Sequence, residues 1–223
     1  AAREEMCTPG TRGWICGPTF KILHDATMPT FLRVIPPDWV KNWNQDNLEL
    51  ELVNGSVVQF RSLDDPERAR GQGLHWAWLD EAAFISERAW DVLRPSLAEH
   101  AGSAFFTTSP AGFDWSYKRI MKKALAHIPG FWGARYKTLD NPIFAHNPVL
   151  RAEVESAKAS MTPQTFAAEY EGEDVNFTGA VYDYEVIQKQ ILDTDEAVKA
   201  HIPEWPELNS NRVVLLGIDT GAD

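Results

Sequence analysis

The apolar run at residues 74–79, which leads directly into Asp80 and Glu81, is the sequence feature that most limits the possible fold. After the two carboxylates the chain returns at once to the apolar residues 82–85. A short apolar run without alternation is typical of a strand that is buried on both faces of a sheet. A solvated surface turn has no need of apolar flanks on both sides, so we expect the acid pair to end a buried strand.

Two further runs have the same form. Residues 14–16 lead into Gly-Pro-Thr at 17–19, and residues 104–108 lead into Ser-Pro-Ala-Gly at 109–112. We expect a buried strand at each, because Pro and Gly mark the loops in which such strands end. Another run, at residues 131–136, predicts one more strand.

Helices are predicted between and after these strands. Trp90, Leu93 and Leu97 recur at helical spacing behind Ser86, a residue type that caps helix N-termini. Pro at the first helical position marks two later helices. The predicted helices cover about residues 86–98, 115–126, 148–159 and 163–171. Strands and helices therefore alternate, which predicts an α/β fold with a mainly parallel sheet covered on both faces.

A β-hairpin is predicted as an insertion in this sheet. Residues 48–53 alternate strictly between apolar and polar, and an Asn-Gly pair separates them from a second run at 57–60. This pattern is typical of a half-exposed hairpin. From residue 172 to about 211 the composition is polar and rich in Asp, Glu and Pro, as in a linker or small subdomain, and residues 212–219 then begin another buried strand.

The overall charge restricts the function classes. The 223 residues carry a formal net charge of -11, which argues against broad nonspecific affinity for nucleic acid but leaves room for a local site. No run approaches the roughly 18 to 20 apolar residues that a membrane span requires, and the N-terminus has no apolar signal-peptide core. With two cysteines there is no disulfide framework to propose. We expect a soluble, intracellular protein.

The place of Asp80 and Glu81 suggests phosphate chemistry, because ligands of parallel α/β sheets bind beyond the carboxyl ends of the strands. A strand-end Asp can hold hydrated Mg²⁺, and a neighbouring Glu can polarise a water for attack on a phosphoryl group. The alternative is that the pair only caps the following helix. The hydroxyls of Thr107, Thr108 and Ser109, about one βαβ unit downstream, are expected beside the acids, within reach of a terminal phosphate, and they favour the first interpretation.

With these motifs in view, the chain resembles the large terminase subunit of tailed bacteriophages, the ATP-driven motor and nuclease that packages the viral genome. LDEAA at 79–83 is similar to the family's Walker B segment, and TTSPAG at 107–112 resembles its coupling motif. WICGPTF at 14–20 resembles the strand and loop that follow the first ATPase helix. FRSLDDPERARG at 60–71 and RPSL at 94–97 stand in the family's order, so the resemblance covers most of the chain.

The resemblance implies roles for single residues. Asp80 would be a Mg²⁺ ligand and Glu81 the catalytic base of ATP hydrolysis. Thr107, Thr108 and Ser109 would bind the nucleotide in the segment that links hydrolysis to movement. Arg70 matches an arginine that reaches the nucleotide of a neighbouring subunit, although a solvated loop charge is the alternative.

The resemblance also implies a second metal centre. The strand at 212–219 is similar to the first strand of the family's C-terminal nuclease, whose fold is like that of ribonuclease H. Asp219 would there be one of several acids that hold two divalent ions. One carboxylate does not assemble two metals, so we expect no DNA cleavage from these residues alone.

The sequence departs from the family in one respect, because no P-loop, Gly-x-x-x-x-Gly-Lys-Ser/Thr, occurs in it. We expect the P-loop and the first strand upstream, so that the chain is a fragment that binds ATP poorly by itself. The predicted domains are a truncated ATPase at 1–172, a linker or subdomain at 173–211 and the start of the nuclease at 212–223.

Partners follow from the resemblance alone. They are double-stranded DNA, the portal protein, the small terminase subunit and further copies of the chain in a ring, with no membrane. The implied location is the cytoplasm of the host bacterium, with transient docking on the viral procapsid. Two alternatives stay open, namely another motor ATPase such as a helicase, and a non-catalytic prophage remnant that only docks partners.

Overall fold

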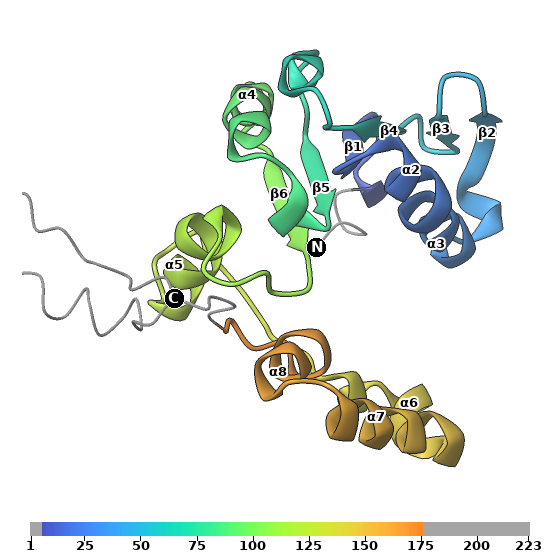
Figure 1. The fold of residues 1–223 in the computed structure, drawn as a ribbon. Helices are drawn as coiled ribbons and strands as arrows, with labels where there is room; N and C mark the ends of the chain where they lie inside the picture. Colours follow the sequence, from blue (N-terminus) through green and yellow to red (C-terminus); the bar gives the residue numbers. More distant parts are fainter. Residues whose placement is uncertain (1–5, 176–223) are drawn as a thin grey trace, which may run out of the picture. The chain divides into compact units, whose positions relative to one another are not determined.

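The computed structural model describes residues 6–175, which fold around a six-stranded sheet of order β2-β3-β4-β1-β5-β6 (Figure 1). β1 pairs in parallel with β4 and β5, and β5 pairs in parallel with β6. β2, β3 and β4 form an antiparallel meander. The strands are β1 (Arg12–Gly17), β2 (Val40–Asn44), β3 (Glu49–Leu52), β4 (Val57–Ser62), β5 (Trp76–Asp80) and β6 (Ser103–Thr107). The predicted α/β fold, with a parallel centre and an inserted hairpin, is confirmed.

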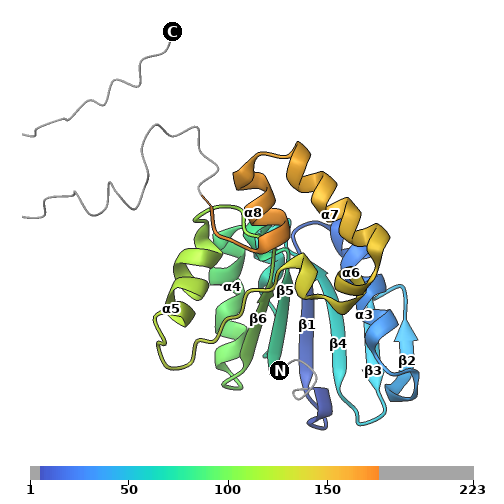
Figure 2. The ribbon, with the colours of Figure 1, turned by 90° about the horizontal axis from the view of Figure 1, so that it is seen from below.

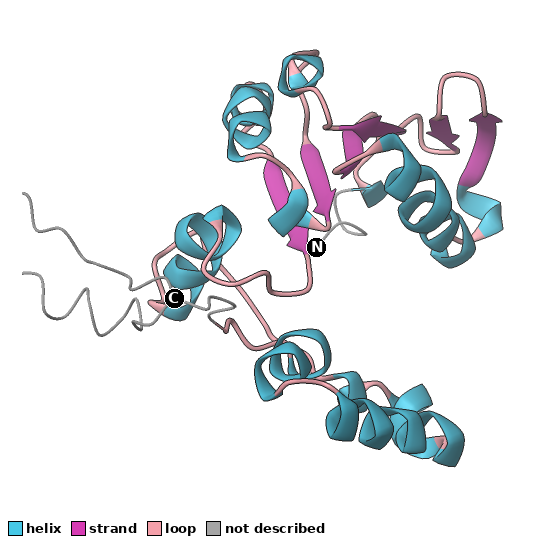
Figure 3. Cartoon of the chain, in the orientation of Figure 1, coloured by secondary structure: helices cyan, strands magenta, loops and turns pink. Residues whose placement is uncertain are grey.

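Helical segments connect the strands and follow them (Figure 3). The α-helices are α2 (Phe20–Ile22), α3 (Met28–Val34), α4 (Glu87–Ala98), α5 (Lys122–Leu125), α6 (Pro142–His146), α7 (Pro148–Ser160) and α8 (Pro163–Glu171). Two π-helical segments, η1 (Leu23–Thr27) and η5 (Tyr117–Met121), continue directly into α3 and α5. The 3₁₀ turns are η2 (Pro37–Trp39), η3 (Pro66–Ala69), η4 (Ala82–Phe84) and η6 (Thr138–Asp140).

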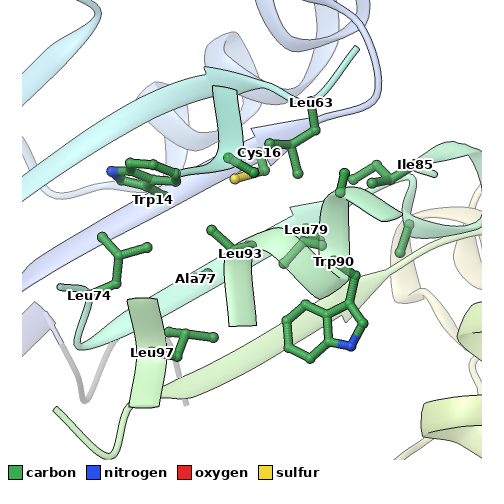
Figure 4. Close-up of a cluster of buried hydrophobic side chains, with 13 residues drawn as sticks. Trp14, Cys16, Leu63, Leu74, Ala77, Leu79, Ile85, Trp90, Leu93 and Leu97 are labelled. Carbon is green, nitrogen blue, oxygen red and sulfur yellow. The ribbon is translucent and has the colours of Figure 1, made fainter. Parts of the chain in front are cut away.

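The central strands are buried on both faces, as their unbroken apolar sequence predicts. Along β5, Ala77 and Leu79 face a first core cluster, whereas Trp76 faces a second. α4 contributes four residues to the first core cluster, which Figure 4 shows between the sheet and this helix. η1 and α3 cover the opposite face with the second core cluster. β5 is thus fixed from both sides, and its carboxyl end has a defined position.

Local sequence signals account for the helix ends. The Ser86 hydroxyl accepts a hydrogen bond from the amide of Ala89 and caps α4, as predicted. α7 and α8 both begin with Pro, behind the capping residues Asn147 and Thr162. Figure 2 shows that α8 lies near the carboxyl ends of β5 and β6. The two later helices are therefore where their sequence places them.

One predicted strand is wrong. Residues 131–136 form no strand, and Trp132 and Tyr136 are largely exposed. The segment packs instead on the preceding helical segment, where Gly133 lies against Met121 and Ala124. A strand needs a neighbour for its backbone hydrogen bonds, and sequence periodicity gives no sign of whether one exists.

The sequence interpretation also missed two elements. Residues 20–34 form a continuous helical segment, which the Thr19 hydroxyl caps by accepting a hydrogen bond from the amide of Ile22. β2 lies just before the predicted hairpin, and Trp43 on this strand packs edge-on to Phe60 at 5.7 Å between ring centroids. Both elements add side chains that pack in or against the second core cluster.

The described residues all belong to one compact unit, which ends at Val175. The predicted strand at 212–219, Asp219 and nearly all of the predicted linker at 173–211 lie outside the described residues. Among residues 6–175, no helix is both long enough and apolar enough to cross a membrane.

A substitution at Gly13 tests the contact between β1 and β5. A Cβ at this position would lie 1.8 Å from the ring of Trp76, its register partner on β5. Overpacking of this kind forces backbone or side-chain shifts. We expect Gly13→Ala to lower the free energy of unfolding by about 3 kcal/mol, measured by urea denaturation.

Gly10→Ala is the matched control, because no atom lies within 4 Å of its added Cβ. Gly10 has a φ of +73°, so its substitution should cost about 1 to 2 kcal/mol through backbone conformation alone. Equal losses in both variants would contradict the proposed packing of Gly13 on Trp76.

Candidate active site at the carboxyl edge of the sheet

Asp80 is the last residue of β5, between the ends of two parallel neighbours. Its register partner on β6 is Thr107, whose hydroxyl donates a hydrogen bond to Asp80 Oδ1 at 2.7 Å. The Trp78 indole Nε1–H donates to the same Thr107 oxygen, also at 2.7 Å. A hydroxyl that accepts from an indole must direct its own proton elsewhere, so this chain of bonds points the Thr107 proton at Asp80.

The second oxygen of Asp80 is held from the other side. The hydroxyl of Thr27, the last residue of the π-helix η1, donates to Asp80 Oδ2 at 2.7 Å. Thr27 is 1% exposed, so this bond is shielded from water. Hydrogen bonds to a charged acceptor contribute about 1.5 to 3 kcal/mol each to stability. The orientation of the Asp80 carboxylate is therefore set by two hydroxyls from two different elements.

Glu81 adopts a backbone conformation that is rare for its residue type. Its φ of 52° and ψ of 46° lie in the left-handed region, which turns the chain sharply from β5 into η4. Such conformations cost free energy and gather at functional sites. Glu81 itself is half-buried.

Burial raises the pKa of the Glu81 carboxyl above its usual range, and the charges of Asp80 and Glu169 raise it further. Glu169 belongs to α8, so a helix far along the chain contributes to the electrostatics of this turn. A carboxyl with a raised pKa takes up a proton more readily than an ordinary one, which is the property of a general base.

The polar loop after β6 lies against the acid turn. The Thr108 hydroxyl accepts a hydrogen bond from the amide of Ala83 at 3.3 Å and donates to the carbonyl of Ser109 at 2.9 Å. The structure thus brings Thr107 to Asp80 and Thr108 to the turn that follows Glu81. Ser109 is half-buried, and no hydrogen bond joins its side chain to either acid within residues 6–175.

Arg70 lies apart from the two acids. It follows η3, and its Nε donates to Glu67 Oε2 at 2.7 Å, while Arg88 on α4 holds the other oxygen of Glu67 at 2.8 Å. The side chain of Arg70 is 67% exposed. No hydrogen bond or ion pair within the described residues joins it to Asp80 or Glu81, so the structure does not bring Arg70 into the same site.

The donor set at the edge suits a magnesium ion bound mainly by water and phosphate. Residues 6–175 contain no group of three or more His, Cys, Asp or Glu side chains that could hold a metal by themselves. Mg²⁺ usually binds through one or two carboxylates together with waters and substrate phosphates. Asp80, with its two oxygens oriented at a strand end, fits that requirement.

Thr27 is the site residue that sequence reasoning missed. It belongs to no motif, and it lies 53 residues before Asp80. A buried threonine within a helix is common, so no local signal distinguishes it. Only the packing of η1 across the sheet shows which threonine faces the acid.

These features define an α/β protein whose candidate site lies at the carboxyl edge of parallel strands. Residues 35–189 match the family model described as "Terminase large subunit, T4likevirus-type, N-terminal". The chain belongs to this family of terminase large subunits. That membership sets aside the interpretation as a helicase.

Known proteins agree with this assignment. The chain is 28% identical over 189 residues to the terminase large subunit of Escherichia phage T5, covering 80% of this chain and 39% of that protein. It is 28% identical over 142 residues to the terminase large subunit of Thermus phage G20c, covering 53% and 28%. The chain therefore spans less than half the length of these relatives.

Solved structures share the fold. The large terminase ATPase domain of Thermus phage P74-26 superposes with a TM-score of 0.56 and 24% identity, covering 77% of this chain and 80% of that one. The large terminase of another thermophilic bacteriophage, solved in complex with ADP, superposes with a TM-score of 0.59 and 15% identity, covering 76% and 42%.

The raised pKa of Glu81 predicts a pH-dependent effect on stability. The folded state holds the Glu81 proton to higher pH than the unfolded state does, so this group's contribution to stability falls as pH rises from the unfolded pKa through the raised folded pKa. Glu81→Gln removes this cost. We expect the variant to be more stable than wild type at pH 7, by at most about 1 kcal/mol because Glu81 retains some contact with water.

The measurement is thermal unfolding in EDTA across pH 3.5 to 7, a range chosen around the usual Glu pKa of about 4.3. The difference should disappear at the acidic end. Glu153→Gln, at an exposed position of α7, is the control and should show no such trend. A Glu81→Gln variant that is less stable than wild type at pH 7 would show that the ionised carboxylate is favourably placed.

Proposed function

We propose that this chain is the motor part of a large terminase, which hydrolyses ATP to drive double-stranded viral DNA into the capsid. The observation that carries the proposal is the acid pair at the end of β5, with Asp80 held by two hydroxyls and Glu81 set in a strained, half-buried turn. A pair that served only as a helix cap would need neither feature. The ADP complex of the thermophilic phage terminase, which shares the fold, supports the choice of nucleotide.

Glu81 is the proposed general base. Its raised pKa favours acceptance of a proton from a water molecule that attacks the terminal phosphate. Asp80 remains the proposed ligand of Mg²⁺, which would neutralise charge on the phosphates. The two neighbouring acids therefore have separate tasks.

The segment at residues 107–109, which runs from the end of β6 into the following loop, is the proposed link between hydrolysis and movement. Thr107 contacts Asp80, and Thr108 contacts the amide of Ala83 in the acid turn. Any shift of the acid turn is therefore transmitted directly to the loop that follows β6. Thr107, Thr108 and Ser109 remain the proposed contacts of the nucleotide's terminal phosphate.

The wider assignment extends beyond the described residues. We assign residues 1–172 to the motor, 173–211 to a linker and 212–223 to the start of a nuclease in which Asp219 would bind a divalent ion. The proposed partners are double-stranded DNA, the portal protein, the small terminase subunit and further copies in a ring. The proposed setting is the host cytoplasm, on the viral procapsid. Family membership supports these partners without identifying the surfaces that they use.

Glu81→Gln tests the proposed chemistry. The protein is produced from its full natural reading frame, because ATP binding needs a P-loop and these 223 residues contain none. We expect ATP turnover to fall by about 10²- to 10⁴-fold, since a general base contributes that much to rate. Nucleotide affinity should stay within about threefold of wild type, because charge neutralisation at Glu81 leaves Asp80 in place.

The control for this experiment is Glu153→Gln, which should hydrolyse ATP at the wild-type rate. Hydrolysis by Glu81→Gln at the wild-type rate would remove Glu81 from the mechanism. A wild-type protein with an intact P-loop and no ATPase activity would instead support the interpretation as a non-catalytic remnant.

Arg70 is proposed to act on the nucleotide of a neighbouring subunit, since it is exposed and lies apart from its own acid pair. In the assembled motor we expect Arg70→Ala to lower turnover by about 10³- to 10⁵-fold, the range of documented arginine fingers. Mixed assemblies of Arg70→Ala and Glu81→Gln subunits should recover part of the activity, because some interfaces then combine an intact Arg70 with an intact Glu81.

Arg68→Ala is the matched control, since Arg68 is equally exposed and lies two residues away. It should leave turnover unchanged. Full activity of assembled Arg70→Ala, or loss of activity to the same extent in Arg68→Ala, would show that Arg70 is an ordinary surface charge.

A further inference from the structure

The hydroxyl of Thr27 makes a contact that local structure does not require. A threonine hydroxyl within a helix ordinarily bonds to a carbonyl one turn earlier. Here the carbonyl of Leu23 accepts instead from the amide of Met28, the wider bond of a π-helix, and the Thr27 hydroxyl leaves the helix to reach Asp80 Oδ2. π-helical segments are rare and are frequent at functional sites.

The two hydroxyls on Asp80 differ in how firmly they are held. Thr107 is exposed and belongs to β6, which pairs on one side only within the described sheet. Thr27 is 1% exposed, and its neighbours Leu23 and Met28 are packed in the second core cluster. Thr27 therefore links Asp80 to the packed interior of the protein. Thr107 instead links Asp80 to the exposed loop that begins after β6.

The bonding pattern leaves Asp80 able to act as a ligand. Each carboxylate oxygen has two lone-pair positions, and Thr27 and Thr107 occupy one on each. The remaining positions have a fixed direction because the carboxylate is held at both ends.

From this arrangement we propose that Thr27 is a positioning residue, which orients Asp80 toward the hydrated divalent cation of the bound nucleotide. The inference rests on the proposed ATPase function. It adds a residue from a segment that no motif marks. It also connects the helical segment at residues 20–34 to the site, since η1 carries the hydroxyl.

The test compares Thr27→Val, which replaces the hydroxyl by a methyl group of similar size, with Thr27→Ser, which keeps it. The protein is expressed from its full natural reading frame. We expect Thr27→Val to raise the Mg²⁺ concentration for half-maximal ATP hydrolysis by about 10- to 100-fold, as loss of a residue that orients a metal ligand typically does. Thr27→Ser should stay within about threefold of wild type, because its hydroxyl can still donate.

A second readout does not depend on turnover. The affinity for a slowly hydrolysed ATP analogue is measured by calorimetry with Mg²⁺ and with EDTA, and the ratio of the two affinities should shrink in Thr27→Val. Thr30→Val, at an exposed position three residues along on α3, is the control and should leave the ratio unchanged. Should Thr27→Val fail to fold, Thr27→Ala takes its place and is compared with Thr27→Ser in the same way.

The outcomes separate the two proposals. A wild-type protein with a P-loop that shows no Mg²⁺-dependent nucleotide binding or hydrolysis would overturn the proposed function. A Mg²⁺-dependent wild type, together with a Thr27→Val or Thr27→Ala protein of unchanged Mg²⁺ dependence, would overturn the role of Thr27 alone. A loss of thermal stability without a change in Mg²⁺ dependence would likewise assign Thr27 a purely structural role.

Discussion

Burial of β5 on both faces is the constraint on which the rest of the structure depends. Alternate side chains of this strand enter two separate core clusters, and the strand has a parallel neighbour on each side. It can neither slide nor twist without disturbing both cores. Hydrophobic packing therefore sets the position of Asp80, and the hydroxyls of Thr27 and Thr107 set the orientation of its carboxylate.

The residue after Asp80 breaks several rules that the rest of the strand obeys. Glu81 has a positive φ, is half-buried and lies close enough to the charges of Asp80 and Glu169 for its pKa to rise. Each feature costs stability, and a small polar residue would avoid most of that cost. A native sequence that retains a costly residue at the exposed edge of a rigid strand is most simply explained by chemistry at that edge.

Much of the fold could be predicted because it follows from local patterns. The apolar run before Asp80, the alternation before an Asn-Gly pair and the cap at Ser86 each depend on neighbours in sequence, and each appears in the structure. The failures depend on contacts between distant segments. Residues 131–136 have a strand-like pattern but pack on the preceding helix, and Thr27 gains its importance only from a carboxylate 53 residues away. Sequence patterns of one chain contain no information about such partners.

Electrostatics at the carboxyl edge require a cation from outside the acid pair. Asp80 and Glu81 already repel each other, Glu169 on α8 adds to that repulsion, and a nucleotide would bring further negative charge. Arg70, the candidate arginine of this chain, is neutralised by Glu67, a carboxylate that Arg88 also binds. Within the described residues Arg70 bonds to Glu67 through Nε, so the outer nitrogens of its guanidinium form no hydrogen bond with that carboxylate. A bound magnesium ion and an arginine from a neighbouring copy would each supply positive charge to this acidic edge. Because the edge of a single copy repels the nucleotide's negative charge, hydrolysis would then depend on assembly of several copies.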